Sequence, residues 1–399
     1  MSFTPKSCAV MKGLAALTIA VVLTAFGMPR ANAAEPYDIY AILSLTGPLA
    51  LIGGDAQTSL QTVQDLVNKT GGIHGQPIRF VIEDDQSQPA TAVQLANGII
   101  AKNVPVILGP VYGASCLSIS PLVRSGPVMY CLAPAIHPPP GSYTFSASTS
   151  TFDSAQAWFT FALSMGWKRL AVLSSTDAAG QDQDRQIDAV AANPKYGALS
   201  VVDREHFGIG DVSLAAQAIQ LKASNPDAII LTSVGTPTGT ALRALKDAGL
   251  EKVPVITNQG NLVHAELEQF ASFVPDRLYL TAPRFVTYDI SMKGPVRDAQ
   301  RTFYDALRAK GIEPDGPHSL SWDASLIFID ALRRLGTGAT AKGLRDYLEG
   351  YHGYAGTIGI FDFRDGSQRG VGLSSVVVVR WSPERKTWST VSEIGGKAR

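Results

Sequence analysis

The stretch VPVILGPVYGAS, residues 104–115, decides the fold class of this chain. Its first five residues are an apolar run of the length that a buried strand takes, and Gly109 and Pro110 end that run. A helix is predicted directly afterwards, over 115–123. A short strand that leads through a turn of small residues into a helix is typical of a parallel sheet flanked by helices.

The same alternation extends to both sides of this stretch. An N-terminal series has predicted strands at 39–43, 79–83 and 128–132 and helices at 55–68 and 89–101. A second series has helices at 152–165, 182–192, 213–222 and 238–247 and strands at 169–173, 199–203, 228–232, 253–256 and 278–281. The last third has amphipathic helices at 294–310, 319–335 and 341–349 and β-rich runs at 356–362 and 374–381. We therefore predict an α/β protein of two similar lobes, each a parallel sheet with helices on both faces.

The first 34 residues have the layout of a secretory signal peptide. Lys6 and Lys12 give a basic start, an uncharged run covers 13–28, and ANAA at 31–34 has the small-x-small pattern that signal peptidase cuts. The alternative is a membrane anchor, but a spanning helix needs roughly 20 apolar residues and this run is shorter. We expect cleavage near Ala33 or Ala34 and an exported mature protein.

Charge argues against nucleic acid as a partner. The chain has 34 basic and 34 acidic residues, and the leader removes Lys6, Lys12 and Arg30 but no acid, so the mature net charge is near −3. Binding to phosphates needs a basic face, which this balance does not supply. Removing 34 of the 399 residues leaves 365, a length that favours two domains.

Two cysteines, Cys116 and Cys131, remain after the leader and its Cys8 are removed. An exported pair fifteen residues apart is a disulfide candidate, and two buried free thiols are the alternative. Neither cysteine has a His or an acid at ligand spacing, so we expect no metal site, and nothing in the sequence predicts a cofactor.

The turns after the predicted strands are rich in Gly, Pro, Ser and Thr. Ligands in parallel α/β sheets lie beyond the carboxyl ends of the strands, and a helix that starts there offers free backbone N–H groups to an anion. Ordinary turn and cap chemistry explains any one of these turns, but several at strand ends favour a binding crevice. The turns lie at 44–48, 109–115, 133–137, 174–178 and 257–260.

Sequence motifs of common enzyme classes are missing. The chain has no Gly-x-Ser-x-Gly elbow, no phosphate-binding loop, no His-Glu-x-x-His and no Gly-x-Gly-x-x-Gly. Ser115 with His137 is the one pair that an exported hydrolase could use. Asp84 and Asp85 could suggest paired carboxylates, but we interpret them as a turn that faces water and caps the helix at Pro89. We therefore expect a protein that is not an enzyme.

Several motifs resemble the leucine/isoleucine/valine-binding proteins, the type I periplasmic solute-binding proteins of ATP-driven uptake systems. They begin with LSLTGPLA at 43–50, NKTGGIHG at 68–75 and EDD at 83–85. The resemblance continues in order over nearly the whole mature chain, at 106–109, 127–134, 153–156, 227–230, 241–249 and 321–324.

The resemblance implies two Rossmann-like lobes joined by a three-strand hinge, with a solute held between them. It implies lobe 1 at 35–155 plus 285–360 and lobe 2 at 156–284 plus 361–395, after the signal peptide at 1–34. It also implies a monomer in the periplasm that closes on its ligand and then docks on an inner-membrane ABC permease. A sensory protein that presents its solute to a membrane receptor is the alternative within the fold.

The carboxylate site implied by the resemblance has changed residues. The family Ser falls at Gly113, followed by Ala114 and Ser115, and the family Thr falls at His137, with a backbone contact at Ala135. A carboxylate could still bind, because the backbone N–H groups of 113–115 remain and the imidazole adds a donor.

The ammonium site implied by the resemblance has lost its acid, because the family Glu falls at Gln259. A lost charge-assisted contact costs about 1.5–3 kcal/mol, or more than tenfold in affinity. The family's aromatic positions fall at Ile52, Ala179 and His318, which leaves room for a larger ligand. The hypothesis is a small carboxylate without an α-ammonium, such as an aromatic or α-keto acid. Asp177 keeps the alternative open, because it could replace the missing Glu in a branched-chain amino acid binding protein.

Overall fold

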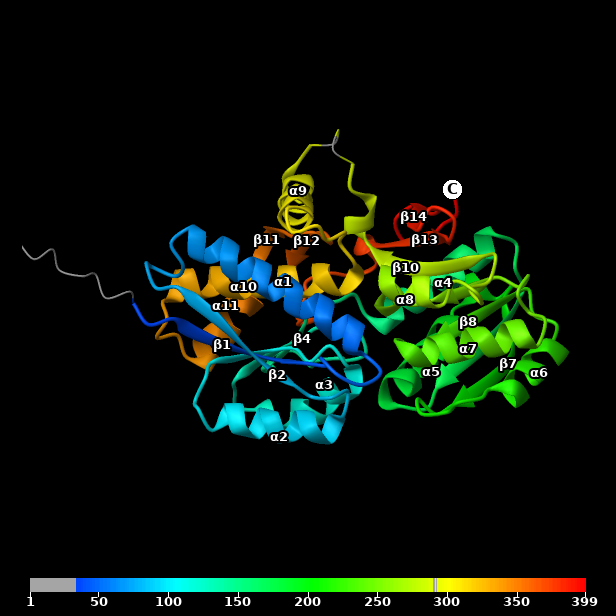
Figure 1. Ribbon diagram of the computed structural model, residues 1–399, viewed down its shortest axis with the longest axis horizontal. Coiled ribbons are helices and arrows are strands. Elements are labelled where there is room, and N and C mark those ends of the chain that lie inside the picture. Colours follow the sequence, from blue (N-terminus) through cyan, green and yellow to red (C-terminus); the bar gives the residue numbers. More distant parts are fainter. Residues whose placement is uncertain (1–33, 290, 292) are drawn as a thin grey trace, which may run out of the picture. The chain divides into compact units, whose positions relative to one another are not determined.

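The computed structural model describes residues 34–289, 291 and 293–399, and Figure 1 shows how its elements are arranged. The predicted leader at 1–34 lies outside these residues except for Ala34. Residues Glu35–Arg399 form one compact unit with two large sheets, in the orders β2-β1-β3-β4-β5 and β14-β13-β10-β9-β8-β6-β7. Within the described ranges, every helix is too short or too polar to cross a membrane.

The first sheet is parallel throughout, as the strand–helix alternation predicts. Alternate residues of strand β1 face opposite sides of the sheet: Ile39 and Leu43 pack with α1 and α10, whereas Ile42 packs with α2 and α3. We call this sheet and the helices on it the first lobe. Its elements are β1 (Tyr37–Leu43), α1 (Ala50–Lys69), β2 (Ile78–Asp84), α2 (Pro89–Ile100), β3 (Val106–Leu108), α3 (Gly113–Ile119), η1 (Ser120–Val123), β4 (Val128–Cys131), β5 (Thr144–Ser146), α9 (Pro295–Arg308), α10 (Gly316–Leu335), α11 (Ala341–Glu349), β11 (His352–Ala355) and β12 (Ile360–Asp362).

The second sheet is parallel from β7 to β10 and ends in two antiparallel strands, β13 and β14. β13 coincides with the β-rich run predicted at 374–381, whereas β14 and the antiparallel pairing were not predicted. Its core also has two faces, with Leu173 packed toward α6, α7 and α8 and Val172 toward α4 and α5. We call this sheet and its helices the second lobe. Its elements are α4 (Thr151–Ser164), β6 (Arg169–Ser175), α5 (Ala178–Ala191), η2 (Pro194–Tyr196), β7 (Ser200–Phe207), α6 (Ala215–Ala223), β8 (Ala228–Thr232), α7 (Thr236–Asp247), β9 (Val255–Thr257), η3 (Gln259–Asn261), α8 (His264–Gln269), β10 (Leu278–Pro283), η4 (Arg284–Thr287), η5 (Leu373–Ser375), β13 (Val376–Ser382) and β14 (Thr387–Thr390).

The chain passes between the two lobes after β5, after β10 and after β12. The buried Arg369 joins two of these segments, because its guanidinium donates to Oγ of Ser146 at 2.8 Å and to the carbonyl oxygen of Ser148 at 2.6 Å. Burial lowers the pKa of Arg369 to about 10, which leaves it charged at neutral pH. The lobe boundaries given above remain a prediction from the resemblance.

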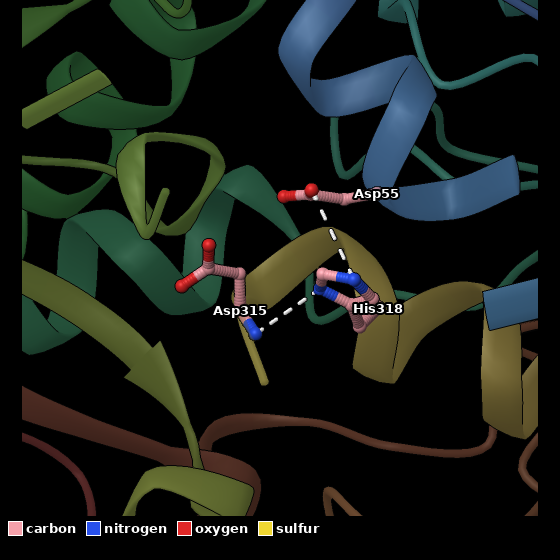
Figure 2. Close-up of side chains that lie close together, drawn as sticks. All are labelled: Asp55, Asp315 and His318. Carbon is pink, nitrogen blue, oxygen red and sulfur yellow. Dashed lines mark hydrogen bonds and ion pairs between the residues drawn. The ribbon is translucent and has the colours of Figure 1, made fainter. Parts of the chain in front are cut away.

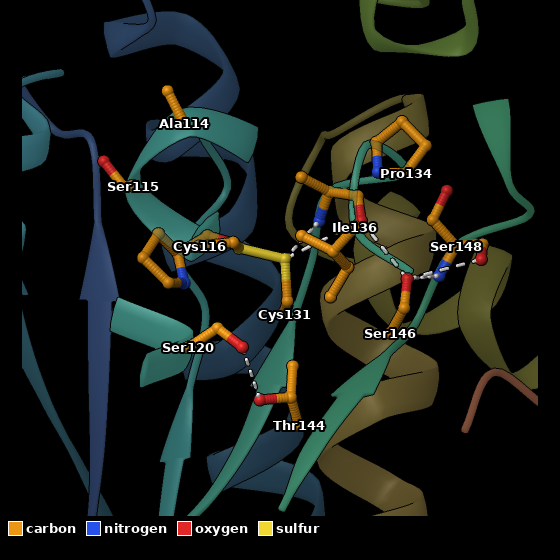
Figure 3. The surroundings of a disulfide bond; sticks show 12 residues. Ala114, Ser115, Cys116, Ser120, Cys131, Pro134, Ile136, Thr144, Ser146 and Ser148 are labelled. Carbon is orange, nitrogen blue, oxygen red and sulfur yellow. Dashed lines mark hydrogen bonds between the residues drawn. A yellow bond between two sulfur atoms is a disulfide. The ribbon is translucent and has the colours of Figure 1, made fainter. Parts of the chain in front are cut away.

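A disulfide joins Cys116 of α3 to Cys131 at the end of β4, as Figure 3 shows. Both cysteines are fully buried among the side chains that cover one face of the first sheet. Nearby, the hydroxyls of Ser120 and Thr144 lie 3.1 Å apart and connect η1 to β5. The disulfide therefore fixes α3, whose first residues form part of the site described next, to the adjacent strand.

Candidate functional site

A cleft lies between the carboxyl ends of the two sets of parallel strands, where ligands of such sheets bind. It holds about 1150 Å³ of space between the atoms, including the part that is open to solvent. The first lobe lines it mainly with residues that follow β1, β3 and β4, and the second lobe with residues that follow β6, β8 and β9. The walls include Leu49, Ile52, Val111, Tyr112, Gly113, Ala133, Pro134 and Ala135 on one side and Ser175, Asp177, Ala179, Thr232, Val234, Asn258, Gln259 and Gly260 on the other.

Among the described residues that line the cleft, Asp177 is the only charged one. It is the N-cap of α5: its Oδ1 accepts from the backbone N–H of Gly180 at 3.0 Å and from the Ser175 hydroxyl at 2.8 Å. The α5 N-terminus and these bonds stabilise the negative charge of the carboxylate. An apolar cleft with one carboxylate favours a ligand whose apolar body carries a positively charged group.

Tyr112 extends from the first lobe and donates its hydroxyl proton to Oδ2 of Asp177 at 2.6 Å. Burial, and then the Asp177 carboxylate, raise the pKa of Tyr112 far above its ordinary value, so the phenol stays protonated and acts as the donor. Tyr112 was not among the predicted site residues, although it directly precedes Gly113 in the predicted turn at 109–115. Tyr112 is the N-cap residue of α3, and its place at a strand-to-helix turn was the sequence signal that could have identified it as a residue of the cleft.

Other contacts also cross the cleft. The backbone N–H of Thr236 donates to the carbonyl oxygen of Pro48 at 3.3 Å. Gly235 has φ +73° and lies so close to the first lobe that a Cβ would come within 2.4 Å of the same carbonyl oxygen. A Cβ on Gly113 would lie 3.3 Å from Cβ of Ala179 in the opposite lobe. The lobes therefore lie against each other in a closed arrangement.

Gln259, which the sequence resemblance places at the family Glu, is buried and its amide donates to the Ser148 hydroxyl. Ser148 belongs to the segment that connects the lobes, so this amide already has a structural role. Because the Gln259 amide is neutral, it cannot balance the positive charge of a ligand ammonium. Asp177 is the anion that lines the cleft among the described residues.

The structure brings six of the predicted site residues together along the cleft walls: Ile52, Gly113, Ala135, Asp177, Ala179 and Gln259. Ala114 lies just behind the wall, packed with Leu49 and Val263. The structure places these residues in or next to the cleft wall. Their contact with a ligand is a proposal.

Three predicted site residues have partners elsewhere. The Ser115 hydroxyl is buried and donates to Oδ2 of Asp85 at 2.9 Å. Nε2 of His137 pairs with Asp182 of α5 at 2.9 Å, which is a contact between the lobes. Ser115 and His137, the pair that the hydrolase alternative needs, therefore bond to two different carboxylates and not to each other. His318 is buried in the first turn of α10, where Pro317 and Leu320 line the cleft in its place.

Asp85 corrects a further expectation. It is fully buried and accepts from the hydroxyls of Ser44 and Ser115, so it does not face water. The N-cap of α2 is Gln88, whose side chain makes no capping bond. The neighbouring Asp84 is the solvent-side residue, and it accepts from the backbone N–H groups of Leu45 and Thr46. Asp85 is therefore a support that holds the start of α3 against β1.

Comparison with known proteins identifies the family. The model of the family described as "Periplasmic binding protein" matches residues 36–386. The Leu/Ile/Val-binding protein homolog 3 of Brucella melitensis is 23% identical, over 77% of this chain and 83% of its own length. An extracellular ligand-binding receptor from Rhodopseudomonas palustris has the same fold, with a TM-score of 0.78 and 20% identity over 89% of this chain and 99% of that one.

A second solved structure from Rhodopseudomonas palustris is the solute-binding protein of an ABC transporter in complex with benzoate. It has a TM-score of 0.72 and 17% identity, over 91% of this chain and 97% of its own. At these identities the solved structures show the fold alone. The family match covers both lobes and the cleft between them, and it confirms the resemblance found in the sequence. The chain therefore belongs to the type I periplasmic binding proteins of the leucine/isoleucine/valine-binding family, which are the substrate-binding components of ABC transporters.

Proposed function

We propose that this protein captures a small carboxylic acid in the cleft and delivers it to an ABC permease, and that the acid is an apolar α-amino acid of the branched-chain type. The observation that carries this proposal is that Asp177 is the one charged side chain lining the cleft among the described residues. A zwitterion adds no net charge to such a site. An organic anion would add a second negative charge, and burying like charges together is costly.

The two ends of the ligand have different partners in this proposal. The ammonium group lies at Asp177, whose Oδ2 already accepts one hydrogen bond from Tyr112 and can accept another. The carboxylate lies at the backbone of Gly113, where no side chain separates a ligand from the start of α3. Ile52, Val111 and Val234 supply apolar surface for the aliphatic part of the ligand. The Leu/Ile/Val-binding name of the Brucella melitensis relative supports this ligand class.

The second candidate is an aromatic or α-keto acid without an ammonium group. It is favoured by the neutral Gln259, which the sequence resemblance places where the family has a Glu. It is also favoured by Ile52 and Ala179, which line the cleft and which the resemblance places where the family has larger aromatic rings. The Rhodopseudomonas palustris structure with benzoate shows that this fold accommodates such a ligand in another protein. In this reading Asp177 serves as the α5 cap and as the partner of Tyr112.

A melting-temperature screen of the mature chain, starting at Glu35, separates the two candidates. L-Leucine and its α-keto acid form a matched pair, because they differ in the group on the α-carbon, and benzoate represents the aromatic acids. A ligand at about 100 times its Kd adds about 2.7 kcal/mol to the free energy of unfolding. A shift with leucine and none with the other two supports the amino acid. The opposite pattern supports the second candidate, and no shift with any of the three contradicts both.

A further inference from the structure

Five titratable residues form a buried cluster beside the cleft, and they come from both lobes. Asp55 lies on α1, and Asp315 and His318 lie at the start of α10, so these three belong to the first lobe. His264 and Glu266 lie on α8 of the second lobe. We call these five residues the acid cluster. Figure 2 shows Asp55 facing the imidazole of His318, with Asp315 on the other side of that ring.

The geometry of the acid cluster argues for bound protons over a bound metal ion. One donor atom each of Asp55, Asp315 and His318 lies within 4.8 Å of the others, as in a metal site. However, Nδ1 of His318 accepts the backbone N–H of Asp315 at 3.2 Å. A neutral imidazole with an accepting Nδ1 carries its proton on Nε2, the nitrogen that faces Asp55. That nitrogen then has no lone pair for a metal.

Two carboxyl groups of the acid cluster have oxygens without hydrogen-bond partners among the described residues. Oε2 of Glu266 is one, and the whole residue is only 2% exposed; Oδ2 of Asp55 is the other. A buried carboxylate without donors is unfavourable, and such a group takes up a proton instead. Burial, with help from the negative charge of Asp315, raises the pKa of both Asp55 and Glu266 to about 8.

The surrounding charges do not neutralise this pair. The imidazole of His264 bonds to Oδ1 of Asp315 and its backbone N–H donates to Oδ2, so His264 is paired with Asp315 and not with Asp55 or Glu266. Burial raises the pKa of Asp315, although the hydrogen bond and the charge of His264 act in the opposite direction. Burial lowers the pKa of His264, but the hydrogen bond to Asp315 and the charges of Asp315, Glu313 and Glu268 together outweigh it and raise the pKa. Burial, and then the charge of His264, lower the pKa of His318 to about 4, so it is neutral.

The strands β13 and β14 of the second sheet pack against α8, and neither they nor the turn between them places a cation beside Asp55 or Glu266. Trp381 of β13 packs edge-on against the ring of His264, and Trp388 of β14 packs against it at a tilt. Lys386, between those strands, pairs with the exposed Glu268 at 2.8 Å. Within the described chain, Asp55 and Glu266 therefore lie near each other without a counter-ion.

We propose that closing the cleft makes the protein take up protons at Asp55 and Glu266, so that ligand binding is coupled to pH. When the lobes separate, each carboxyl group meets water and ionises with its ordinary pKa near 4. When the lobes close, as in this structure, Glu266 is buried and the Asp55 side chain keeps only 24% of its exposure, and both groups take up protons. Because the closed form binds the protons, affinity is highest at low pH and falls as the pH rises toward 8. The fall is up to about tenfold per pH unit for each proton taken up.

The test uses L-leucine and benzoate as probes, and it rests on the proposed function only in assuming that one of them binds. Titration calorimetry at pH 7 in two buffers of different ionisation heat counts the protons taken up on binding. The wild type is expected to take up between one and two. D55N/E266Q, which places neutral amides at both positions, is expected to take up none and to bind equally well from pH 6 to pH 8.5. Asp65→Asn, an exposed change on the same helix, is the control and should behave as the wild type.

A second measurement does not need a ligand. In the G113C/A179C variant the two Cβ atoms would lie about 3.3 Å apart across the cleft, so a disulfide between them would hold the lobes closed. Infrared spectra of this locked variant between pH 5 and pH 9 should contain protonated carboxyl groups that titrate near pH 8, and these groups should be missing from the ligand-free wild type and from the locked variant that also carries D55N/E266Q. If neither probe binds but these groups are present, the ligand assignment fails and the protonated cluster stands. The proposal is overturned if binding takes up no protons, if the double variant keeps the wild-type pH dependence, or if Ca²⁺ or Mn²⁺ raises the melting temperature of the wild type and not that of the variant.

Discussion

The hydroxyl of Tyr112 donates a hydrogen bond to Oδ2 of Asp177 at 2.6 Å, and the two residues come from opposite walls of the cleft. This bond fixes the orientation of the Asp177 carboxylate between the apolar walls of the two lobes. It also ties closure of the lobes to the carboxylate that we assign to the ligand ammonium. A ligand that reaches Asp177 therefore meets a closed state that is already partly stabilised.

Removing the Tyr112 hydroxyl should weaken ligand binding. Tyr112→Phe keeps the ring against the cleft wall but deletes the bond to Asp177 between the lobes. A hydrogen bond to a charged group contributes about 1.5–3 kcal/mol, so the Kd should rise about tenfold or more. Titration with the ligand found in the screen measures this change. An unchanged or lower Kd would show that the hydroxyl does not stabilise the closed state.

A side chain at residue 235 should prevent closure. In Gly235→Ala the new Cβ would lie 2.4 Å from the carbonyl oxygen of Pro48 if the lobes stayed as they are. The lobes can avoid this clash by opening, so we expect at least a tenfold loss of ligand affinity, together with a lower melting temperature because alanine is strained at the φ of +73° that Gly235 has. Gly166→Ala is the matched control, because Gly166 has a φ of +74° and a Cβ there meets nothing within 4 Å, so it carries the backbone strain without the contact between the lobes. Equal affinities for the two variants would contradict the closed contact.

Loss of the disulfide should destabilise the first lobe. In the C116S/C131S variant the fifteen-residue loop is no longer closed, which costs about 3 kcal/mol in the free energy of unfolding. Urea unfolding of the oxidised wild type and of the variant measures the difference. The prediction fails if the variant is as stable as the wild type, or if the wild type treated with a reductant keeps its midpoint.

The fold could be predicted from the sequence because its signal is local. Apolar runs at 39–43 and 228–232 coincide with the strands β1 and β8 to within two residues. The helix predicted at 182–192 begins earlier, at Ala178, because Asp177 caps it. β5, α8 and β14 were not predicted, since strands of three or four residues and a helix of six have too short a pattern.

The candidate site could be predicted only in part. Residues placed by strand ends, such as Gly113 and Gln259, reach the cleft. Ser115 and His137 have the right chemistry, but Asp85 and Asp182 bind them. These partners lie 30 and 45 residues away in the chain, and no local pattern reveals such pairs. The acid cluster joins residues of α1, α8 and α10 and was invisible in the sequence for the same reason.

The most direct test of the central claim is the Kd of L-leucine for the wild type and for Asp177→Asn, measured by titration calorimetry at pH 7. The variant keeps the size of the side chain but removes the negative charge from the cleft. Asp247→Asn, an exposed change in the last turn of α7 of the second lobe, is the control. We predict that the wild type and the control bind leucine and that Asp177→Asn binds it at least tenfold more weakly. Equal affinity of Asp177→Asn and the wild type for leucine would contradict the assignment of Asp177 as the ammonium partner.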